Sequence, residues 1–213
     1  MYSPIFYRHI TEMSKLSDIY NETHRNDRDK WDYTALSRNP NLTMEMVSEN
    51  IEQPWDWNRL AWRKDLDLTI VKNNPMELWD WARISVHPSL TLTDITDILA
   101  TNPFATFDWT AISENKTIAT IANVTAMTAY PWDWSAISRV ATIEDINANI
   151  DSGWDFTQLS KRADLPMQLV RENNTKPWDW RELSKNPLVD GDMMKTYKHK
   201  PWDFQYMSRV IHE

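Results

Sequence analysis

Hydrophobic and polar residues follow one pattern that returns eight times along the chain, at intervals of about 24 residues. Each copy begins with an aromatic residue, an aspartate and a second aromatic residue, and an aliphatic residue stands five positions after the first aromatic. Residues three apart lie on one face of a helix, so the second aromatic and the aliphatic residue predict the buried side of a short helix. The first aromatics of copies one to eight are Trp31, Trp55, Trp79, Phe107, Trp132, Trp154, Trp178 and Trp202.

A second apolar group follows in each copy and predicts a second helix. In copy one, Leu42, Thr43 and Val47 have the spacing of a hydrophobic residue, a helix cap and a hydrophobic residue that packs back on the first. Asparagines such as Asn50 stand where the second helix should end, and we expect them to adopt the left-handed conformation. Each copy is therefore predicted to contain a first and a second short helix joined by turns.

Helices this short are not stable alone, so the copies must bury their apolar faces against each other. The sequence therefore predicts an all-α protein: an α-solenoid of eight helix-turn-helix repeats built from short α or 3₁₀ helices. We expect a capping helix and linker in residues 1–30 and one continuous repeat domain over residues 31–213. The third copy has 28 residues and the fifth has 22, so we expect turn residues to be added in one and removed in the other.

The aspartate after the first aromatic occurs in all eight copies. A carboxylate at the start of a helix accepts hydrogen bonds from free backbone N–H groups and lies at the positive end of the helix dipole. Because an active site is needed only once, a feature repeated eight times indicates a structural role. We predict that the following residues are N-caps: Asp32, Asp56, Asp80, Asp108, Asp133, Asp155, Asp179 and Asp203.

Composition argues against several classes of function. The chain has no cysteine, which excludes disulfides, thiolate metal sites and cysteine nucleophiles. Two glycines are too few for a phosphate-binding loop, and the five histidines have no partners at metal-ligand spacing. Serine recurs six positions after the first aromatic, but no histidine recurs beside it to act as a base. We therefore predict no catalytic residue, no metal and no cofactor.

Basic residues recur seven positions after the first aromatic, although the chain carries a net charge of −8. Stacking of the copies would align these residues, called the basic row from here on, along one surface. They could balance the negative end of each short helix, or they could bind an acidic peptide or the backbone of a nucleic acid. The basic row consists of Arg38, Arg139, Lys161, Lys185 and Arg209.

Two families resemble this pattern. The stretch "LSRNPNLT", residues 36–43, resembles the leucine-rich repeat variant family, which implies a stack of alternating α and 3₁₀ helices; the cysteines of that family's iron–sulfur module are missing here. The fuller signature "PWDWRELSKNP", residues 177–187, is similar to tryptophan-rich repeats in proteins of giant DNA viruses, over roughly residues 31–210. The second resemblance implies repeat architecture and suggests a virion or an infected cytoplasm, but neither family supplies a catalytic residue.

The leading interpretation is a non-enzymatic repeat scaffold that binds a protein partner, which the sequence does not identify. Two alternatives stay open: binding of nucleic acid or another acidic ligand along the basic row, and self-assembly of a structural protein through the C-terminal end. The chain has neither a secretory signal nor an apolar stretch long enough to span a membrane. We expect a soluble intracellular protein without a membrane partner, located in the host cytoplasm or the virion if it is viral.

Overall fold

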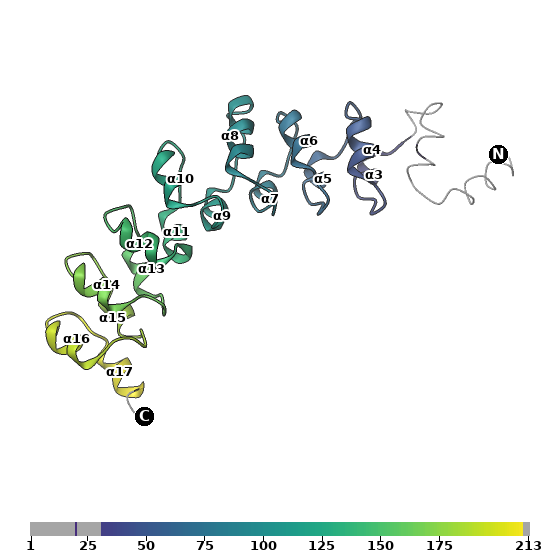
Figure 1. Ribbon diagram of the computed structural model, residues 1–213. Helices are drawn as coiled ribbons and strands as arrows, with labels where there is room; N and C mark the ends of the chain where they lie inside the picture. The colour runs from purple at the N-terminus through teal and green to yellow at the C-terminus, as the bar shows by residue number, and fades with distance from the viewer. Residues whose placement is uncertain (1–19, 21–30, 211–213) are drawn as a thin grey trace, which may run out of the picture. The chain divides into compact units, whose positions relative to one another are not determined.

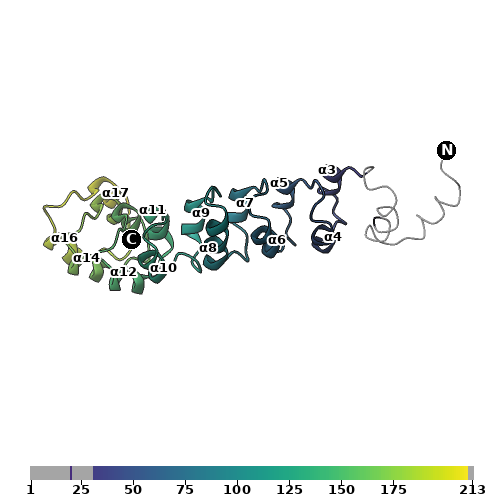
Figure 2. The same cartoon turned by 90° about the horizontal axis from the view of Figure 1, so that it is seen from above.

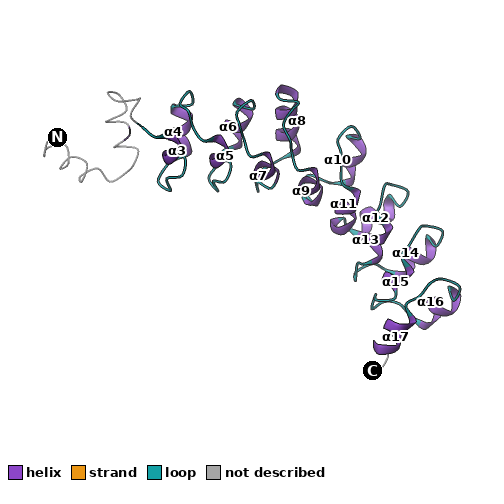
Figure 3. Ribbon diagram, turned by 180° about the vertical axis from the view of Figure 1, so that it is seen from behind, coloured by secondary structure: helices purple, strands orange, loops and turns teal. Residues whose placement is uncertain are grey.

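The computed structural model describes Tyr20 and residues 31–210. The prediction of an all-α repeat solenoid is confirmed: residues 31–210 contain regularly spaced short helices and no strand (Figure 1, Figure 3). The predicted capping helix in residues 1–30 lies outside the described residues, apart from the fully buried Tyr20. The chain divides into two compact units, unit 1 from Met1 to Asp108 and unit 2 from Trp109 to Glu213. The single continuous domain expected from the sequence stays a prediction.

Unit 1 arranges its helices in two rows, one formed by the first helices of copies one to three and one by the second helices (Figure 1, Figure 2). The two helices of each copy are joined by a turn, so successive copies repeat the same pair. The first helices are α3 (Tyr33–Leu36), α5 (Trp57–Leu60) and α7 (Trp81–Ser85), and the second helices are α4 (Met44–Glu49), α6 (Leu68–Asn73) and α8 (Leu92–Thr101).

Unit 2 repeats the same two-row arrangement with copies four to eight (Figure 1). Copy eight has a first helix, and the described residues include no second helix after it. The first helices are α9 (Trp109–Glu114), α11 (Trp134–Val140), α13 (Phe156–Ser160), α15 (Trp180–Leu183) and α17 (Phe204–Val210). The second helices are α10 (Ile121–Ala126), α12 (Ile143–Ala148), α14 (Met167–Glu172) and α16 (Gly191–Thr196).

Aromatic pairs form the core between consecutive copies in each unit. The second aromatic of one copy packs against the first aromatic of the next, as Phe156 does against Trp178 with ring centroids 4.8 Å apart. The indole N–H of the first tryptophan also donates to the carbonyl five residues earlier, from Trp178 to Asn173 at 2.8 Å. A buried indole needs such a partner, so one side chain both fills the core and fixes the loop before it. The same indole bond is made by Trp55, Trp79, Trp132, Trp154 and Trp202.

Carboxylates lie at the starts of the first helices. The Asp179 side chain accepts from the backbone N–H groups of Arg181 and Glu182 at 3.0 and 3.1 Å, which satisfies donors that the helix itself leaves free. Asp108 directly precedes α9, and its own backbone N–H donates to Ser85. Side chains that accept from a backbone N–H at the start of the helix are those of Asp32, Asp56, Asp80, Asp133, Asp155, Asp179 and Asp203.

Copies three and five depart from the 24-residue length in different ways. The prediction that copy three adds turn residues is wrong, because α8 has 10 residues where α6 has 6, and the four extra residues add a turn of helix. The apolar side chains of Ile95 and Ile98 are both fully buried, so the longer helix extends the core. In copy five the turn between α11 and α12 holds only Ala141 and Thr142, as the prediction of removed turn residues requires.

The second helices end differently from our expectation. Asn50 has a φ of −131° rather than a left-handed conformation, and no non-glycine residue of the described part has a positive φ. Its side-chain amide instead donates to the carbonyl of Met46 at 2.9 Å. The amide thereby satisfies one of the carbonyls that the last turn leaves free, so the backbone has no need of the strained region. Asn74, Asn149 and Asn173 make the same bond to the carbonyl four residues earlier.

Candidate functional site

The basic row is exposed, but carboxylates lie beside much of it. Arg139 contacts Glu114 at 2.6 Å, and both residues stand seven positions after a first aromatic, so side chains at this position do touch between neighbouring copies of unit 2. Lys185 pairs with Glu182 at 2.9 Å. Lys161 and Arg209 are exposed and make no ion pair within the described part of the chain.

Aspartate caps lie on the same surface as the basic row. In unit 1, Arg38 lies 4.0 Å from the carboxylate of Asp56, which caps the first helix of the next copy. Trp62 takes the place of a basic residue in copy two, and its indole N–H donates to Asp80 at 3.0 Å. Carboxylates therefore lie beside this position in copies one and two, which weakens the attraction of the surface for a polyanion.

The recurring serine joins neighbouring copies. The Ser184 hydroxyl donates to the carbonyl of Trp180 at 2.8 Å, and it accepts the backbone N–H of Asp203 in the next copy at 2.8 Å. The sequence suggests only the first bond, because the second joins residues 19 positions apart. Copy two has Ala61 instead and cannot make this link. The other serines that accept from an aspartate of the next copy are Ser37, Ser85, Ser113, Ser138 and Ser160.

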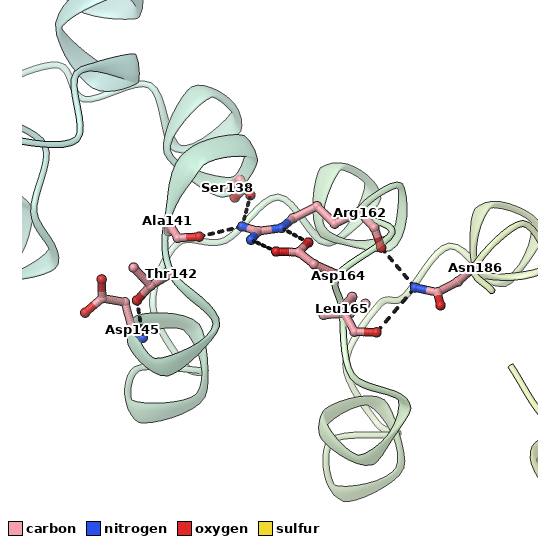
Figure 4. A network of polar contacts seen from close by, with 8 residues as sticks. All are labelled: Ser138, Ala141, Thr142, Asp145, Arg162, Asp164, Leu165 and Asn186. Atoms are coloured by element: carbon pink, nitrogen blue, oxygen red, sulfur yellow. Dashed lines mark hydrogen bonds and ion pairs between the residues drawn. The ribbon is translucent and has the colours of Figure 1, made fainter. Parts of the chain in front are cut away.

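A second polar link in unit 2 uses the residue eight positions after the first aromatic (Figure 4). The guanidinium of Arg162 donates to the carbonyls of Ser138 and Ala141 in the preceding copy, at 3.3 and 2.6 Å. Its Nε and second terminal nitrogen donate to the carboxylate of Asp164. In the next copy, the amide of Asn186 donates to the carbonyls of Arg162 and Leu165, at 2.9 and 3.3 Å. These donors satisfy carbonyls in the turn of the preceding copy, and we call them the carbonyl ladder.

The carbonyl ladder is incomplete between copies two and three, and also between copies four and five, where Val140 has no side-chain donor. Arg63 donates to the carbonyls of Asn39 and Leu42, as Arg162 does in unit 2. His87 occupies the next position, where its Nδ1 accepts from the Ser89 backbone at 3.3 Å and its buried Nε2 has no hydrogen-bond partner. Burial lowers the pKa of His87, and the nearby positive charge of Arg83 lowers it further. An unpartnered buried donor carries a desolvation cost, so His87 should stabilise this junction less than Asn186 stabilises its counterpart in unit 2.

Large apolar side chains are exposed on two loops of unit 1. Met76 and Leu78 lie between α6 and α7 and are 70% and 82% exposed, and Phe104 lies between α8 and α9 and is 82% exposed. The amide of Asn102 donates to the carbonyl of Pro75 at 2.7 Å, and its oxygen accepts the N–H of Phe104. One side chain therefore holds the two loops together. We call Met76, Leu78 and Phe104 the loop patch.

Trp62 extends the apolar surface toward the first helices. Its ring is half exposed, and the guanidinium carbon of Arg83 lies 4.4 Å from the ring centroid. Its indole is bonded to Asp80, which lies two residues after Leu78. Trp79 between them is buried, so in this extended segment the side chains of Leu78 and Asp80 point away from the core. Leu78 and Trp62 therefore lie on one outer surface.

Sequence reasoning missed the loop patch because it followed the periodic positions. The sequence feature that could have revealed it is a large apolar residue at a position where the other copies have a residue of another kind. Where copy three has Leu78 before its first tryptophan, most other copies have a proline. The periodic pattern predicts which side chains are buried, and the patch consists of large apolar residues outside that pattern.

Neither a metal site nor a membrane-spanning helix is found in the described residues. No group of histidine, aspartate and glutamate side chains in residues 31–210 could hold a metal ion. No helix in the described part has the length and apolar character that crossing a membrane requires. Comparisons with protein-family models, curated proteins and solved structures give no match to this chain.

Proposed function

We propose that this protein is a non-enzymatic repeat scaffold that binds a protein partner through the loop patch and the neighbouring Trp62. The exposed loop patch is the observation that carries this proposal. Large apolar side chains exposed on neighbouring loops favour association with another protein, and tryptophan and arginine are enriched at the points where such interfaces gain most of their binding energy. The resemblance to viral repeats would place the partner in the virion or the infected cell.

The core of unit 1 supports this proposal because it is complete without the loop patch. Leu60, Val71, Ile84 and Ile95 are fully buried, and the aromatic pairs between copies are formed. The three patch residues add little to the core, since at least 70% of each remains exposed. Binding of a partner would explain why apolar side chains occupy positions at which folding does not need them.

Capture of partners from the native cell or virion extract tests the proposal. The tagged chain, a variant with Leu78→Ser and Phe104→Ser, and a variant with Lys161→Glu and Arg209→Glu would be compared with and without nuclease. The proposal expects a discrete protein that resists nuclease, is lost with the loop-patch variant and is retained by the charge variant. Equal capture by all three forms would overturn it, and so would turnover of a substrate by the purified chain.

A second candidate function is binding of an anionic ligand along the part of the basic row in unit 2. Lys161 and Arg209 favour it, since both are exposed without an ion pair in the described residues. Binding of this kind depends on released counterions, so its affinity should fall steeply with salt and vanish with the charge variant. Capture that is lost after nuclease treatment would favour this function over the first.

A further inference from the structure

The fourth residue of each second helix shows which helix face the next copy covers. In copies one to six this residue is 0–2% exposed: Val47, Val71, Ile95, Val124, Ile146 and Val170. In copy seven the same position is Met194 on α16, which is only partly buried. Val189, just before the cap of α16, is also partly buried, whereas its equivalent Leu165 in copy six is fully buried.

The structure shows what covers the equivalent face of α14 in copy six. Asn186 donates its amide to the carbonyls of Arg162 and Leu165. Asp190, the N-cap of α16, pairs with Arg171 at 2.7 Å. The cover is thus a short helix with an acidic N-cap and an amide donor four residues before it.

The face of α16 offers the same chemistry, and we call it the terminal face. Val189, Met194 and Lys195 repeat the positions of Leu165, Val170 and Arg171. Lys195 is 83% exposed and lies 3.7 Å from the exposed Asp192 of its own helix. No side chain of the described residues donates to the carbonyls of Asn186 and Val189. A groove of about 590 Å³ lies along this face, with Val189, Met194, Tyr206 and Met207 in its wall.

We infer that the terminal face binds a short amphipathic helix of another chain, equivalent to the second helix of a further repeat of this kind. Its occupant carries apolar side chains for Val189 and Met194, an acidic N-cap for Lys195, and an amide or guanidinium donor for the two carbonyls. This mode of binding continues an interface that the chain already makes between its own copies, and it matches the placement of helices in apolar grooves of other proteins. The inference deepens the proposed protein-binding function, but it rests on a different unit and different residues.

The test uses the full chain and a synthetic peptide of residues 184–200, which contains Asn186, Asp190 and Met193 and is the natural cover of α14. A ¹⁵N-labelled chain would be titrated with peptide to millimolar concentration, since a six-residue helix loses much binding energy to ordering. Binding at the terminal face should shift the amide signals around Val189, Met194 and Lys195, and Met194→Glu should abolish these shifts. Leu188→Glu is the matched control, because Leu188 is 51% exposed and lies outside the groove wall.

The peptide variants sharpen the result. Peptides with Asn186→Ala or Asp190→Lys should give smaller shifts, while the Leu188→Glu chain should respond as the unaltered chain does. Absence of shifts would overturn the inference, and so would shifts that persist in the Met194→Glu chain or occur only elsewhere. Because the loop patch stays intact in these variants, failure here leaves the capture experiment on Leu78 and Phe104 as a separate test of the proposed function.

Discussion

The junction between copies two and three and the junction between copies six and seven have the same fold and different polar links. In unit 2, Ser160 accepts the N–H of Asp179, and Asn186 completes the carbonyl ladder. In unit 1, Ala61 replaces the serine and His87 leaves its Nε2 unpartnered. The aromatic and aliphatic core is present at both junctions, so the stack forms without the serine and amide bonds. Copies two and three are joined by other bonds, from Trp62 to Asp80 and from Asn102 to Pro75.

The junction of copies two and three also carries the exposed apolar surface. Leu78 and Trp62 lie where copies two and three meet. Met76 lies on the same loop as Leu78, and Phe104 lies on the loop that Asn102 joins to it. Natural proteins often give up stability at places where function needs an exposed or adaptable surface. The missing serine and amide bonds between copies two and three therefore agree with the binding surface that we propose at this junction.

The largest effect is expected where the two junctions are alike. Leu60 and Leu183 are both fully buried at the same position of their copies. Replacing either by alanine should lower the free energy of unfolding by about 2–5 kcal/mol, because the lost contacts leave a cavity. Urea denaturation of the two variants would measure the loss in the free energy of unfolding. A loss in only one variant would show that the cores of the two junctions differ as well as their polar links.

The carbonyl ladder predicts the next largest difference. Asn186→Ala should lower the free energy of unfolding by about 1–3 kcal/mol, because it leaves the buried carbonyl of Leu165 without its amide partner. The variant to compare with it is at His87, which stands at the same position in copy three as Asn186 does in copy seven. His87→Asn should instead raise the free energy of unfolding by about 1 kcal/mol, since it removes an unpartnered donor and supplies an amide. Thermal unfolding that shows both variants destabilised would contradict the proposed ladder.

Exchange of the serine and the alanine should give smaller, opposite changes. Ala61→Ser supplies an acceptor for the N–H of Asp80, and Ser160→Ala removes the acceptor for the N–H of Asp179. Each change should alter the free energy of unfolding by about 0.5–1.5 kcal/mol, upward in the first variant and downward in the second. Matched denaturation curves would check the signs, and two changes of the same sign would show that the hydroxyl does not join the copies.

The smallest expected effect is a pH dependence confined to the junction of copies two and three. Burial and Arg83 lower the pKa of His87 below its ordinary value of about 6.5. Below that value the unfolded chain binds the proton more readily than the folded chain, so the stability from neutral His87 is lost as the pH falls through this range. Unfolding curves across it should show a slope that His87→Asn reduces, and an unchanged slope would assign the titration to another group.

Local patterns allowed the repeat, the short helices and their acidic starts to be predicted from the sequence. The aspartate and the aromatic beside it act within one turn of helix, so their roles can be read from spacing alone. The links of Ser160 to Asp179 and of Asn186 to Leu165 join residues 19 and 21 positions apart, and only stacking brings them together. The loop patch was missed for a related reason, since exposure depends on how complete the core is without it.

Hydrogen exchange of the unaltered chain tests the central claim most directly, which is that the serine and amide bonds make the junction of copies six and seven firmer than that of copies two and three. The account predicts faster exchange for the backbone N–H groups of α5, α6 and Asp80 than for those of α13, α14 and Asp179, because the serine and amide bonds are missing between copies two and three. A variant with Ala61→Ser and His87→Asn should bring the two sets closer together. Equal protection in the unaltered chain, or greater protection between copies two and three, would contradict the account.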